Sequence, residues 1–120
     1  DGCFRMNMNE IATATRYNIP IIEVIINNHV LGMVRQWQNL YYGKRYSHTI
    51  LNDQVDFVKL AESYGAYGIR VEREEDIDAA FAEAKKHTDA PTIIEFMIAT
   101  DELVLPMVKS GNPMSEMILK

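Results

Sequence analysis

The sequence predicts an α/β fold whose core is a parallel sheet of βαβ units. Short apolar runs at residues 21–26, 67–71 and 92–98 alternate with segments that have helical periodicity. The first run is apolar almost throughout and rich in β-branched residues, which is typical of a strand covered on both faces of a parallel sheet. A chain of 120 residues with 48% hydrophobic and 24% charged residues suits one globular domain or part of one. Strands and helices in this alternation are expected to form right-handed crossovers in a single sheet.

The first half of the chain predicts one helix before the first strand and one after it. Residues 4–17 carry a helical stripe made of Met8, Ile11, Ala12, Ala14 and Thr15. This helix ends at Asn18 and Pro20, because Asn tolerates a left-handed backbone and Pro does not continue a helix. Strand 21–26 follows. Residues 31–42 then form a second helix, whose larger apolar side chains are expected to pack in a core or an interface: Met33, Val34, Trp37, Leu40 and Tyr41.

The second half predicts two more helices, two more strands and a tail. After a polar loop at 43–54, Asp56 is expected to cap a helix that runs to residue 64 and stops at Gly65. Strand 67–71 leads to the clearest helix, 74–87, which begins with acidic side chains and ends with basic ones, as the helix dipole favours. Strand 92–98 follows, and residues 99–120 form a tail with one helical turn near Ser115.

Composition and charge argue against several classes of protein. Twelve basic and seventeen acidic residues give a net charge of −5, and no Lys/Arg stripe indicates nucleic acid as a partner. The longest apolar run, 19–26, is far shorter than a membrane span. The single cysteine, Cys3, gives neither an internal disulfide nor a zinc spacing, which favours a reduced, cytoplasmic compartment. Because the chain begins at Asp1 in loop-type residues and not at a methionine, we expect an N-terminally truncated piece of a longer polypeptide.

Two predicted loops lie at the edge of the sheet where ligands bind in open α/β folds. Residues 1–3 enter the first helix, and residues 27–30 follow the first strand. Mg²⁺ prefers oxygen ligands, and Asp1 could supply a carboxylate, Asn28 an amide oxygen and Val30 a backbone carbonyl. A glycine at position 2 lets backbone N–H groups approach a phosphate, which the N-terminus of the following helix also attracts. The residues alone leave a second interpretation open, because Asp-Gly and Asn-Asn are also common in ordinary turns.

The spacing of these loops resembles a known motif. Asp1-Gly2, followed after 24 residues by Asn27-Asn28, is similar to the Gly-Asp-Gly…Asn-Asn motif of thiamine diphosphate enzymes without its first glycine. Four longer stretches resemble the acetolactate synthase (acetohydroxyacid synthase) large subunit: 27–38, 42–47, 56–61 and 104–108. The likeness covers essentially the whole chain. It implies that residues 1–120 are the C-terminal portion of the thiamine diphosphate- and Mg²⁺-binding domain, with 99–120 as its C-terminal tail.

The resemblance implies roles for the residues of the two loops. Asp1 and Asn28 match side-chain ligands of Mg²⁺, and Val30 matches the backbone ligand. Gly2 and Cys3 match positions whose backbone amides hold the diphosphate. This family usually has Ser or Ala where this chain has Cys3. The resemblance therefore implies no side-chain hydrogen bond from Cys3 to the diphosphate.

A second group of matched residues lies further along the chain. Gly32 and Met33 match residues that lie against the cofactor. Trp37 matches the residue that shapes the second-substrate pocket and contacts inhibitory herbicides, and Ser110 matches another inhibitor-contact position in the tail. Without the resemblance, Trp37 is interpreted as an aromatic residue of a core or an interface.

The resemblance also implies the chemistry of the whole enzyme. Such an enzyme decarboxylates pyruvate on thiamine diphosphate and adds the two-carbon unit to a second 2-keto acid, pyruvate or 2-ketobutyrate, in branched-chain amino acid biosynthesis. Mg²⁺ anchors the cofactor, and FAD is expected in the parent enzyme on a domain outside this chain. The catalytic glutamate of this family comes from the N-terminal domain of a partner subunit. We therefore expect no catalytic residue within the chain, no activity from the chain alone, and a homo-oligomeric parent that a regulatory subunit could join.

Two alternative functions stay open at this point. One is another thiamine diphosphate enzyme, of the glyoxylate carboligase or pyruvate oxidase type, against which Met33 and Trp37 argue. The other is a non-catalytic folded fragment or assembly module that binds other subunits through surface normally covered by further domains. An exposed apolar patch near Trp37, together with self-association, would favour the second alternative.

Overall fold

The centre of the molecule is a three-stranded parallel sheet. The structure is a computed structural model that describes residues 1–51 and 55–119. The strand order is β1 (Ile22–Asn27), β3 (Thr92–Met97), β2 (Tyr67–Val71), and Glu95 of β3 stands opposite Ile25 on one side and Arg70 on the other. The predicted α/β class and parallel sheet are confirmed, and each strand lies within one residue of its predicted bounds.

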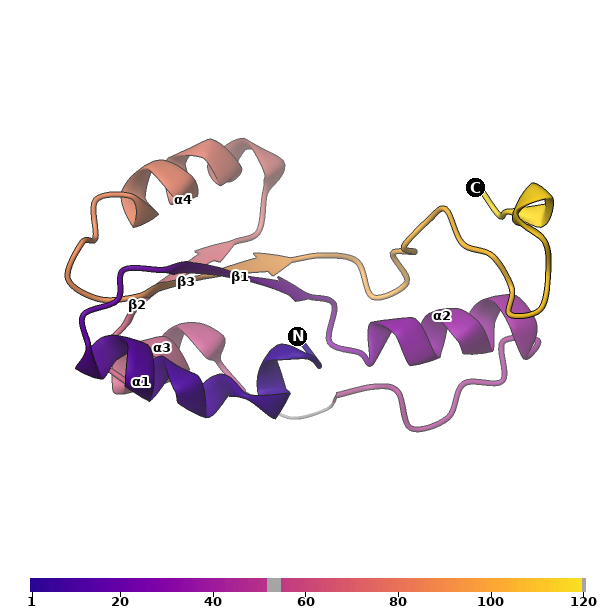
Figure 1. Cartoon of the computed structure of the whole chain (residues 1–120), viewed down its shortest axis with the longest axis horizontal. Coiled ribbons are helices and arrows are strands. Elements are labelled where there is room, and N and C mark those ends of the chain that lie inside the picture. Colours follow the sequence, from indigo (N-terminus) through magenta and orange to yellow (C-terminus); the bar gives the residue numbers. More distant parts are fainter. Residues whose placement is uncertain (52–54, 120) are drawn as a thin grey trace.

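Helices cover both faces of the sheet (Figure 1). Helices α1 (Ile11–Arg16) and α3 (Phe57–Ser63) lie on one face, and α4 (Ile77–Ala84) lies on the other. The two faces of the sheet have separate hydrophobic cores. Neighbouring residues of β3 pack in different cores, because successive side chains of a strand point to opposite faces. Ile93 packs in a cluster with Ile11, Ile25, Phe57, Ala61 and Ala66. Ile94 packs in a second cluster with Val71, Ala80 and Ala84.

The predicted helix at 4–17 is α-helical over its last part alone. Two 3₁₀ turns, Phe4–Met6 and Met8–Glu10, precede α1. Asn7 separates them with a non-helical backbone (φ −138°, ψ 23°), which breaks the regular hydrogen-bond ladder. The buried side of α1 is narrower than predicted and consists of Ile11 and Ala14. Asn18 ends the helix in the left-handed region (φ 52°), as the sequence predicts.

The caps of α3 follow the sequence, whereas α4 is shorter than predicted. The Asp56 carboxylate accepts hydrogen bonds from the backbone N–H groups of Val58 and Lys59 at 3.1 and 3.2 Å, and Gly65 adopts φ 80° beyond the helix. The predicted helix at 74–87 begins with a 3₁₀ turn, Glu74–Asp76, and is α-helical over Ile77–Ala84. Tightened first turns of this kind are common at helix termini.

One face of β1 is open at Val24 and Ile26, and the prediction that both of its faces are covered is wrong there for the described chain. Ile25 and Asn27 are buried, but 42% of Val24 and 51% of Ile26 are exposed. The strand lies at an edge of the sheet, and the buried cluster under α4 consists of residues of β2, β3 and α4. The apolar run therefore provides more hydrophobic surface than the helices of this chain cover.

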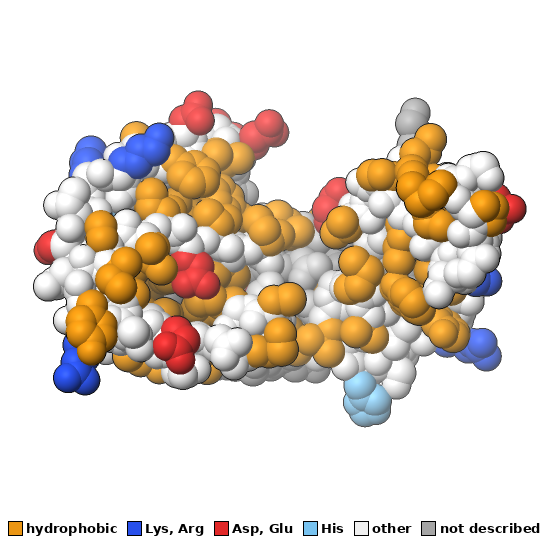
Figure 2. Space-filling view, viewed as in Figure 1, with side chains coloured by type: hydrophobic (Ala, Val, Ile, Leu, Met, Phe, Trp, Pro, Cys, Tyr) orange, Lys and Arg blue, Asp and Glu red, His pale blue; other side chains and the backbone are white. Residues whose placement is uncertain are grey.

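Helix α2 (Gly32–Tyr41) projects away from the sheet, and the tail folds back beside it (Figure 1). The tail contains a 3₁₀ turn at Met114–Glu116, where the sequence predicts one near Ser115. An antiparallel bridge between Met107 and Ile118 closes the tail on itself. Figure 2 shows a hollow between the sheet and the end formed by α2 and the tail, with hydrophobic side chains on both sides. Among the residues described, the helices are too short or too polar to cross a bilayer.

Candidate functional site

The two loops predicted to form a site meet at the carboxyl end of β1. The N-terminal ammonium group of Asp1 donates a hydrogen bond to the Ile26 carbonyl at 2.6 Å, next to the end of the strand. The loops enclose a cavity of about 410 Å³. Every residue predicted to hold metal or cofactor lines this cavity: Asp1, Gly2, Cys3, Asn28, Val30, Gly32 and Met33. The structure thus brings these residues together.

The carboxylate of Asp1 is buried and only partly paired. Its side chain has no exposed surface, and its Oδ2 accepts a hydrogen bond from Arg5 Nη2 at 3.3 Å. Its Oδ1 has no hydrogen-bond partner among the described residues. A buried oxygen left without a partner costs about 1–3 kcal/mol, and more for a charged group. A cation bound by this carboxylate would give the oxygen a partner.

The loop after β1 is shaped by two asparagine side chains. Asn27 Oδ1 accepts a hydrogen bond from the backbone N–H of His29 at 3.0 Å, and Asn28 Oδ1 accepts one from that of Val30 at 3.3 Å. His29 takes a left-handed backbone conformation (φ 59°) between them. Side-chain bonds to the backbone two residues ahead are the usual turn chemistry of Asn. They direct the polypeptide so that Asn28 and Val30 line the cavity while His29 is exposed.

Gly2 and Gly32 each make a close contact with the segment after β1. A Cβ atom on Gly32 would lie 3.1 Å from Asn28 Nδ2, and one on Gly2 would lie 3.1 Å from Leu31 Cδ2. Both contacts are tighter than ordinary packing, so a side chain at either position would require the Asn28 or Leu31 side chain to shift. The Cys3 thiol is free and exposed at the mouth of this arrangement.

The donor set is one carboxylate, one amide and one backbone carbonyl. Across residues 1–51 and 55–119, no three side chains of His, Cys, Asp or Glu gather as a metal centre of the usual kind. A site built from Asp1, Asn28 and Val30 contains one such side chain, so it would not form a group of that type. Oxygen donors of this mixed kind suit a hard cation that keeps further ligands from phosphate or water.

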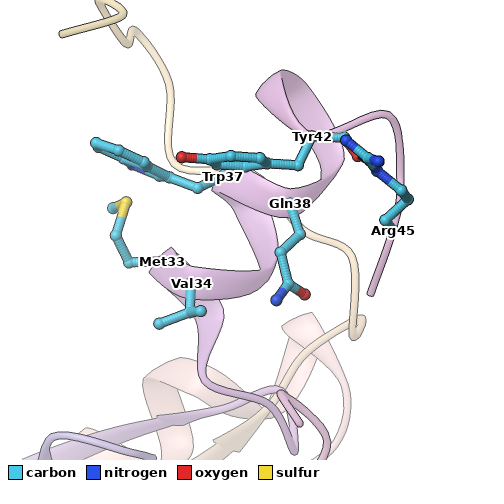
Figure 3. Close-up of a pocket in the computed structure, with 6 residues that line it drawn as sticks. All are labelled: Met33, Val34, Trp37, Gln38, Tyr42 and Arg45. Atoms are coloured by element: carbon cyan, nitrogen blue, oxygen red, sulfur yellow. Dashed lines mark hydrogen bonds between the residues drawn. The ribbon is translucent and has the colours of Figure 1, made fainter. Parts of the chain in front are cut away.

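A second cavity, of about 560 Å³, lies beside α2 (Figure 3). It is lined by Met33, Val34, Trp37, Gln38, Tyr42 and Arg45. Met33 and Val34 also line the first cavity, so the two spaces adjoin. Figure 3 shows Met33 and Trp37 projecting to the same side of the helix, as residues four apart do. The Trp37 ring makes an edge-to-face contact with Tyr41, with centroids 5.7 Å apart.

The predicted pocket residue Ser110 is not among the residues that line the Trp37 cavity. It is exposed in the tail. Its neighbour Lys109 places Nζ 5.6 Å from the centroid of the Tyr41 ring, so this part of the tail lies beside the last turn of α2.

Comparison with known proteins identifies the family. Residues 1–96 match the family model described as thiamine pyrophosphate enzyme, C-terminal TPP binding domain; pyrophosphate is another name for the diphosphate. The chain belongs to this family. The match includes both loops of the first cavity, α2 and the whole sheet up to residue 96 of β3.

Relatives within this thiamine pyrophosphate family confirm the resemblance seen in the sequence. The acetolactate synthase large subunit of Haemophilus influenzae is 42% identical over 119 residues, covering 99% of this chain and 21% of the relative. The acetolactate synthase of Mycobacterium bovis is 46% identical over 120 residues, covering 97% of this chain and 19% of the relative. The Escherichia coli acetolactate synthase isozyme 2 large subunit is 39% identical over 120 residues, covering 100% of this chain and 22% of the relative. The chain thus spans about a fifth of the length of these relatives.

A solved structure supports the fold. The thiamine diphosphate-dependent 4-hydroxybenzoylformate decarboxylase of Rhodococcus jostii RHA1 is similar with a TM-score of 0.75 and 33% sequence identity. The similarity covers 86% of this chain and 19% of the decarboxylase. The chain therefore shares its arrangement of sheet and helices with part of a thiamine diphosphate-dependent decarboxylase.

An ionic network around the buried Glu95 adjoins the loop after β1 and was not predicted from the sequence. Glu95 is 2% exposed, and its two carboxylate oxygens accept hydrogen bonds from Asn27 Nδ2 at 2.7 Å and Arg70 Nε at 2.8 Å. Arg70 also donates to Asp56 Oδ1 at 2.8 Å. The hydrogen bond to Glu95 raises the pKa of the Arg70 guanidinium above its ordinary value. The signal in the sequence is an acidic residue inside an apolar strand, since a buried charge requires a partner.

Proposed function

We propose that the chain is the C-terminal thiamine diphosphate- and Mg²⁺-binding part of an acetolactate synthase large subunit. The whole enzyme would decarboxylate pyruvate and transfer the two-carbon unit to a second 2-keto acid, pyruvate or 2-ketobutyrate, in branched-chain amino acid biosynthesis. The observation that carries the proposal is the convergence of loops 1–3 and 27–32 on one cavity, with a buried Asp1 oxygen that has no partner among the described residues. The identity to acetolactate synthases over nearly the whole chain supports it.

The residues of the first cavity fit Mg²⁺ and a diphosphate. Asp1 and Asn28 would hold the cation through side-chain oxygens, and Val30 through its carbonyl. The buried Asp1 oxygen supports this assignment, because a cation would supply the partner it lacks. The backbone amides of Gly2 and Cys3 would hold the diphosphate, since a residue without Cβ lets the backbone approach closely. When bound, thiamine diphosphate supplies the electron sink for decarboxylation.

The second cavity would receive the reacting part of the substrates. Gly32 and Met33 would lie against the cofactor, and Met33 lines both cavities, which supports a continuous space between them. Trp37 would shape the pocket for the second 2-keto acid from the far side. The role of Ser110 rests on the resemblance alone.

The remaining properties of the whole enzyme belong to this proposal too. FAD would bind a domain outside the chain, the subunit would form a homo-oligomer in the cytoplasm, and the catalytic glutamate would come from a partner subunit. The chain itself would position the cofactor and exclude water from part of it.

Exposed apolar side chains favour a second candidate function, in which the chain is a non-catalytic assembly module. Val24, Ile26, Met33 and Val34 are each at least 42% exposed, and Trp37 is 37% exposed. Apolar surface of this kind is typical of a binding interface. On this alternative the chain would associate with other subunits and bind no cofactor.

The test uses a full-length large subunit, defined as a relative's large subunit whose aligned segment is replaced by these 120 residues. We expect thiamine diphosphate binding, measured by calorimetry, to require Mg²⁺, and acetolactate to form from pyruvate. Assembly of the subunit without Mg²⁺-dependent cofactor binding would favour the assembly role and contradict the proposed function.

A further inference from the structure

A buried acidic residue lies beside the loop that carries two of the proposed metal ligands. Glu95 occupies the central strand, where register places it between Ile25 and Arg70. The apolar cluster on the same face includes Ile25 and Ile93. Burying a carboxylate at such a position is unfavourable unless it is paired and hydrogen-bonded, and an apolar side chain would often be as stable. Its presence therefore calls for a specific role.

The hydrogen bonds of Glu95 fix the orientation of a neighbouring amide. A carboxylate only accepts hydrogen bonds, so Asn27 must turn its NH₂ group toward Glu95 Oε1, 2.7 Å away. The amide oxygen of Asn27 is then left on the other side, where it accepts from the backbone N–H of His29 at 3.0 Å. With the amide reversed, two acceptors would meet at Glu95 and two donors at His29.

This orientation stabilises a backbone conformation that side chains disfavour. His29 lies at φ 59°, in the left-handed region that is unfavourable for residues other than glycine. The bond from its N–H to Asn27 Oδ1 and the bond from Leu51 N to its carbonyl at 2.9 Å hold it there. The left-handed residue turns the chain so that Asn28 and Val30 line the first cavity.

We propose that Glu95 is a positioning residue for the metal-binding loop. Through the Asn27 amide it sets the turn at His29, and the turn presents the Asn28 side chain and the Val30 carbonyl to the cation. Arg70 supports it from the opposite side by a bond of 2.8 Å to the other carboxylate oxygen. This inference rests on the proposed function, because it requires that the loop bind Mg²⁺.

The test exchanges donors and acceptors without changing size. In Glu95→Gln, the introduced amide can accept from only one of its two donors. Arg70 cannot accept a hydrogen bond, so the oxygen of the introduced glutamine stays toward Arg70 and its NH₂ group faces Asn27. The Asn27 amide must then turn its oxygen toward the glutamine, and it no longer accepts from the His29 N–H. The double variant Glu95→Gln with Asn27→Asp restores the pattern. The introduced aspartate accepts from both the glutamine and His29, and the net charge is that of the wild type.

The readout is binding, measured on the full-length subunit defined above. We expect Glu95→Gln to raise the Mg²⁺ concentration for half-saturated thiamine diphosphate binding by about tenfold or more, as loss of support behind a metal ligand does. We also expect faster hydrogen exchange in a peptide spanning 27–31 of the cofactor-free protein. The double variant is expected to return both quantities to those of the wild type.

Matched variants separate positioning from general stability. Asp56→Asn removes the negative charge that Arg70 faces on its other side and is expected to lower thermal stability while leaving the Mg²⁺ titration unchanged. A Glu95→Gln titration that superimposes on that of the wild type, or a double variant as weak as the single one, overturns the inference. If Glu95→Gln does not fold, the double variant is titrated alone: a wild-type Mg²⁺ requirement supports the inference, and a raised one overturns it. Loss of Mg²⁺-dependent binding in the wild type would instead refute the proposed function.

Discussion

The side-chain amide of Gln36 pairs with the backbone of Val104 in both directions. Its Nε2 donates to the Val104 carbonyl at 2.9 Å, and its Oε1 accepts from the Val104 N–H at 2.7 Å. Gln38 makes the same two bonds with Ser47, each at 3.1 Å. Two glutamines that flank Trp37 thus fasten α2 to the tail and to the loop after the helix. Gln38 lines the second cavity and Val104 lines the first, so each pair holds one of these lining residues in place.

Replacing Gln36 by alanine should detach the tail from α2. The substitution removes both bonds and leaves the backbone N–H and C=O of Val104 unpaired, so we expect a loss of about 2 kcal/mol in local stability. Hydrogen exchange of residues 103–108 in the full-length subunit measures the effect. Gln38→Ala is the matched control and should accelerate exchange near Ser47 without affecting the tail. Equal exchange at 103–108 in wild type and Gln36→Ala would contradict the prediction.

Replacing Asn28 by alanine should raise the Mg²⁺ requirement of cofactor binding. The substitution removes a proposed metal-ligand oxygen. It also removes the acceptor of the hydrogen bond from the Val30 N–H at 3.3 Å, so the loop loses both a metal ligand and a bond that shapes its turn. We expect the half-saturating Mg²⁺ concentration to increase by more than about tenfold. Calorimetric titration of thiamine diphosphate at several Mg²⁺ concentrations tests this. Asn9→Ala, on an exposed turn, is the control. Coincident titrations of Asn28→Ala and wild type would disprove the ligand assignment.

The 120-residue chain alone should form no acetolactate. The proposed catalytic glutamate belongs to a partner subunit, and the chain supplies positioning groups for the cofactor without an acid or base assigned to the reaction. The assay contains the chain with pyruvate, thiamine diphosphate and Mg²⁺, and measures acetolactate against the same mixture containing the full-length subunit. Turnover by the chain above the rate of a protein-free mixture would show that the catalytic machinery is complete within these residues.

The carboxylate of Asp56 should make the stability of the chain depend on pH in the acid range. Hydrogen bonds from the Lys59 backbone, and then the nearby Arg70 charge, lower the pKa of Asp56 below its ordinary value. A group whose pKa falls on folding stabilises the protein above its unfolded pKa, about 3.9, and this stabilisation is lost as the pH falls through the lower folded value. We therefore expect Asp56→Asn to be less stable than wild type at pH 7, with the difference shrinking below about pH 3.9.

Urea unfolding of the chain at several pH values measures this difference. Glu62→Gln, on the exposed side of the same helix, controls for removal of a negative charge from α3. A difference between Asp56→Asn and wild type that is the same at pH 3 as at pH 7 would show that the charge of Asp56 contributes nothing.

The strands could be predicted from sequence because their information is local. The β-branched runs, the Asp56 cap and the stops at Asn18 and Gly65 each depend on a few adjacent residues. Convergence of Asp1 and Asn28 was also within reach, since a helix and a strand between two loops return the chain to the same edge of a sheet. The sequence of β1 could not show whether both of its faces are covered, because that depends on which elements pack over Val24 and Ile26.

The side-chain pairs that hold the site in place were beyond the sequence. Asn27 and Glu95 are 68 residues apart, as are Gln36 and Val104. The residue type of a glutamine or an asparagine gives its donors and acceptors but not its partner, which depends on where distant strands and the tail lie. An acidic residue within the apolar run at 92–98 shows that a partner exists. Identifying that partner as Asn27 requires the register of β1 against β3.

Truncating Trp37 should weaken binding of the second 2-keto acid and leave the cofactor in place. The indole lines the second cavity and contacts Tyr41 edge-to-face at 5.7 Å, but it is absent from the lining of the first cavity. In the full-length subunit we expect Trp37→Ala to raise the KM for the second 2-keto acid while thiamine diphosphate binding is unchanged. Trp37→Phe keeps a ring against Tyr41 and should have a smaller effect, and Tyr17→Ala controls for loss of a remote exposed aromatic. An equal loss of cofactor binding in Trp37→Ala would show that the two cavities are not separate in function.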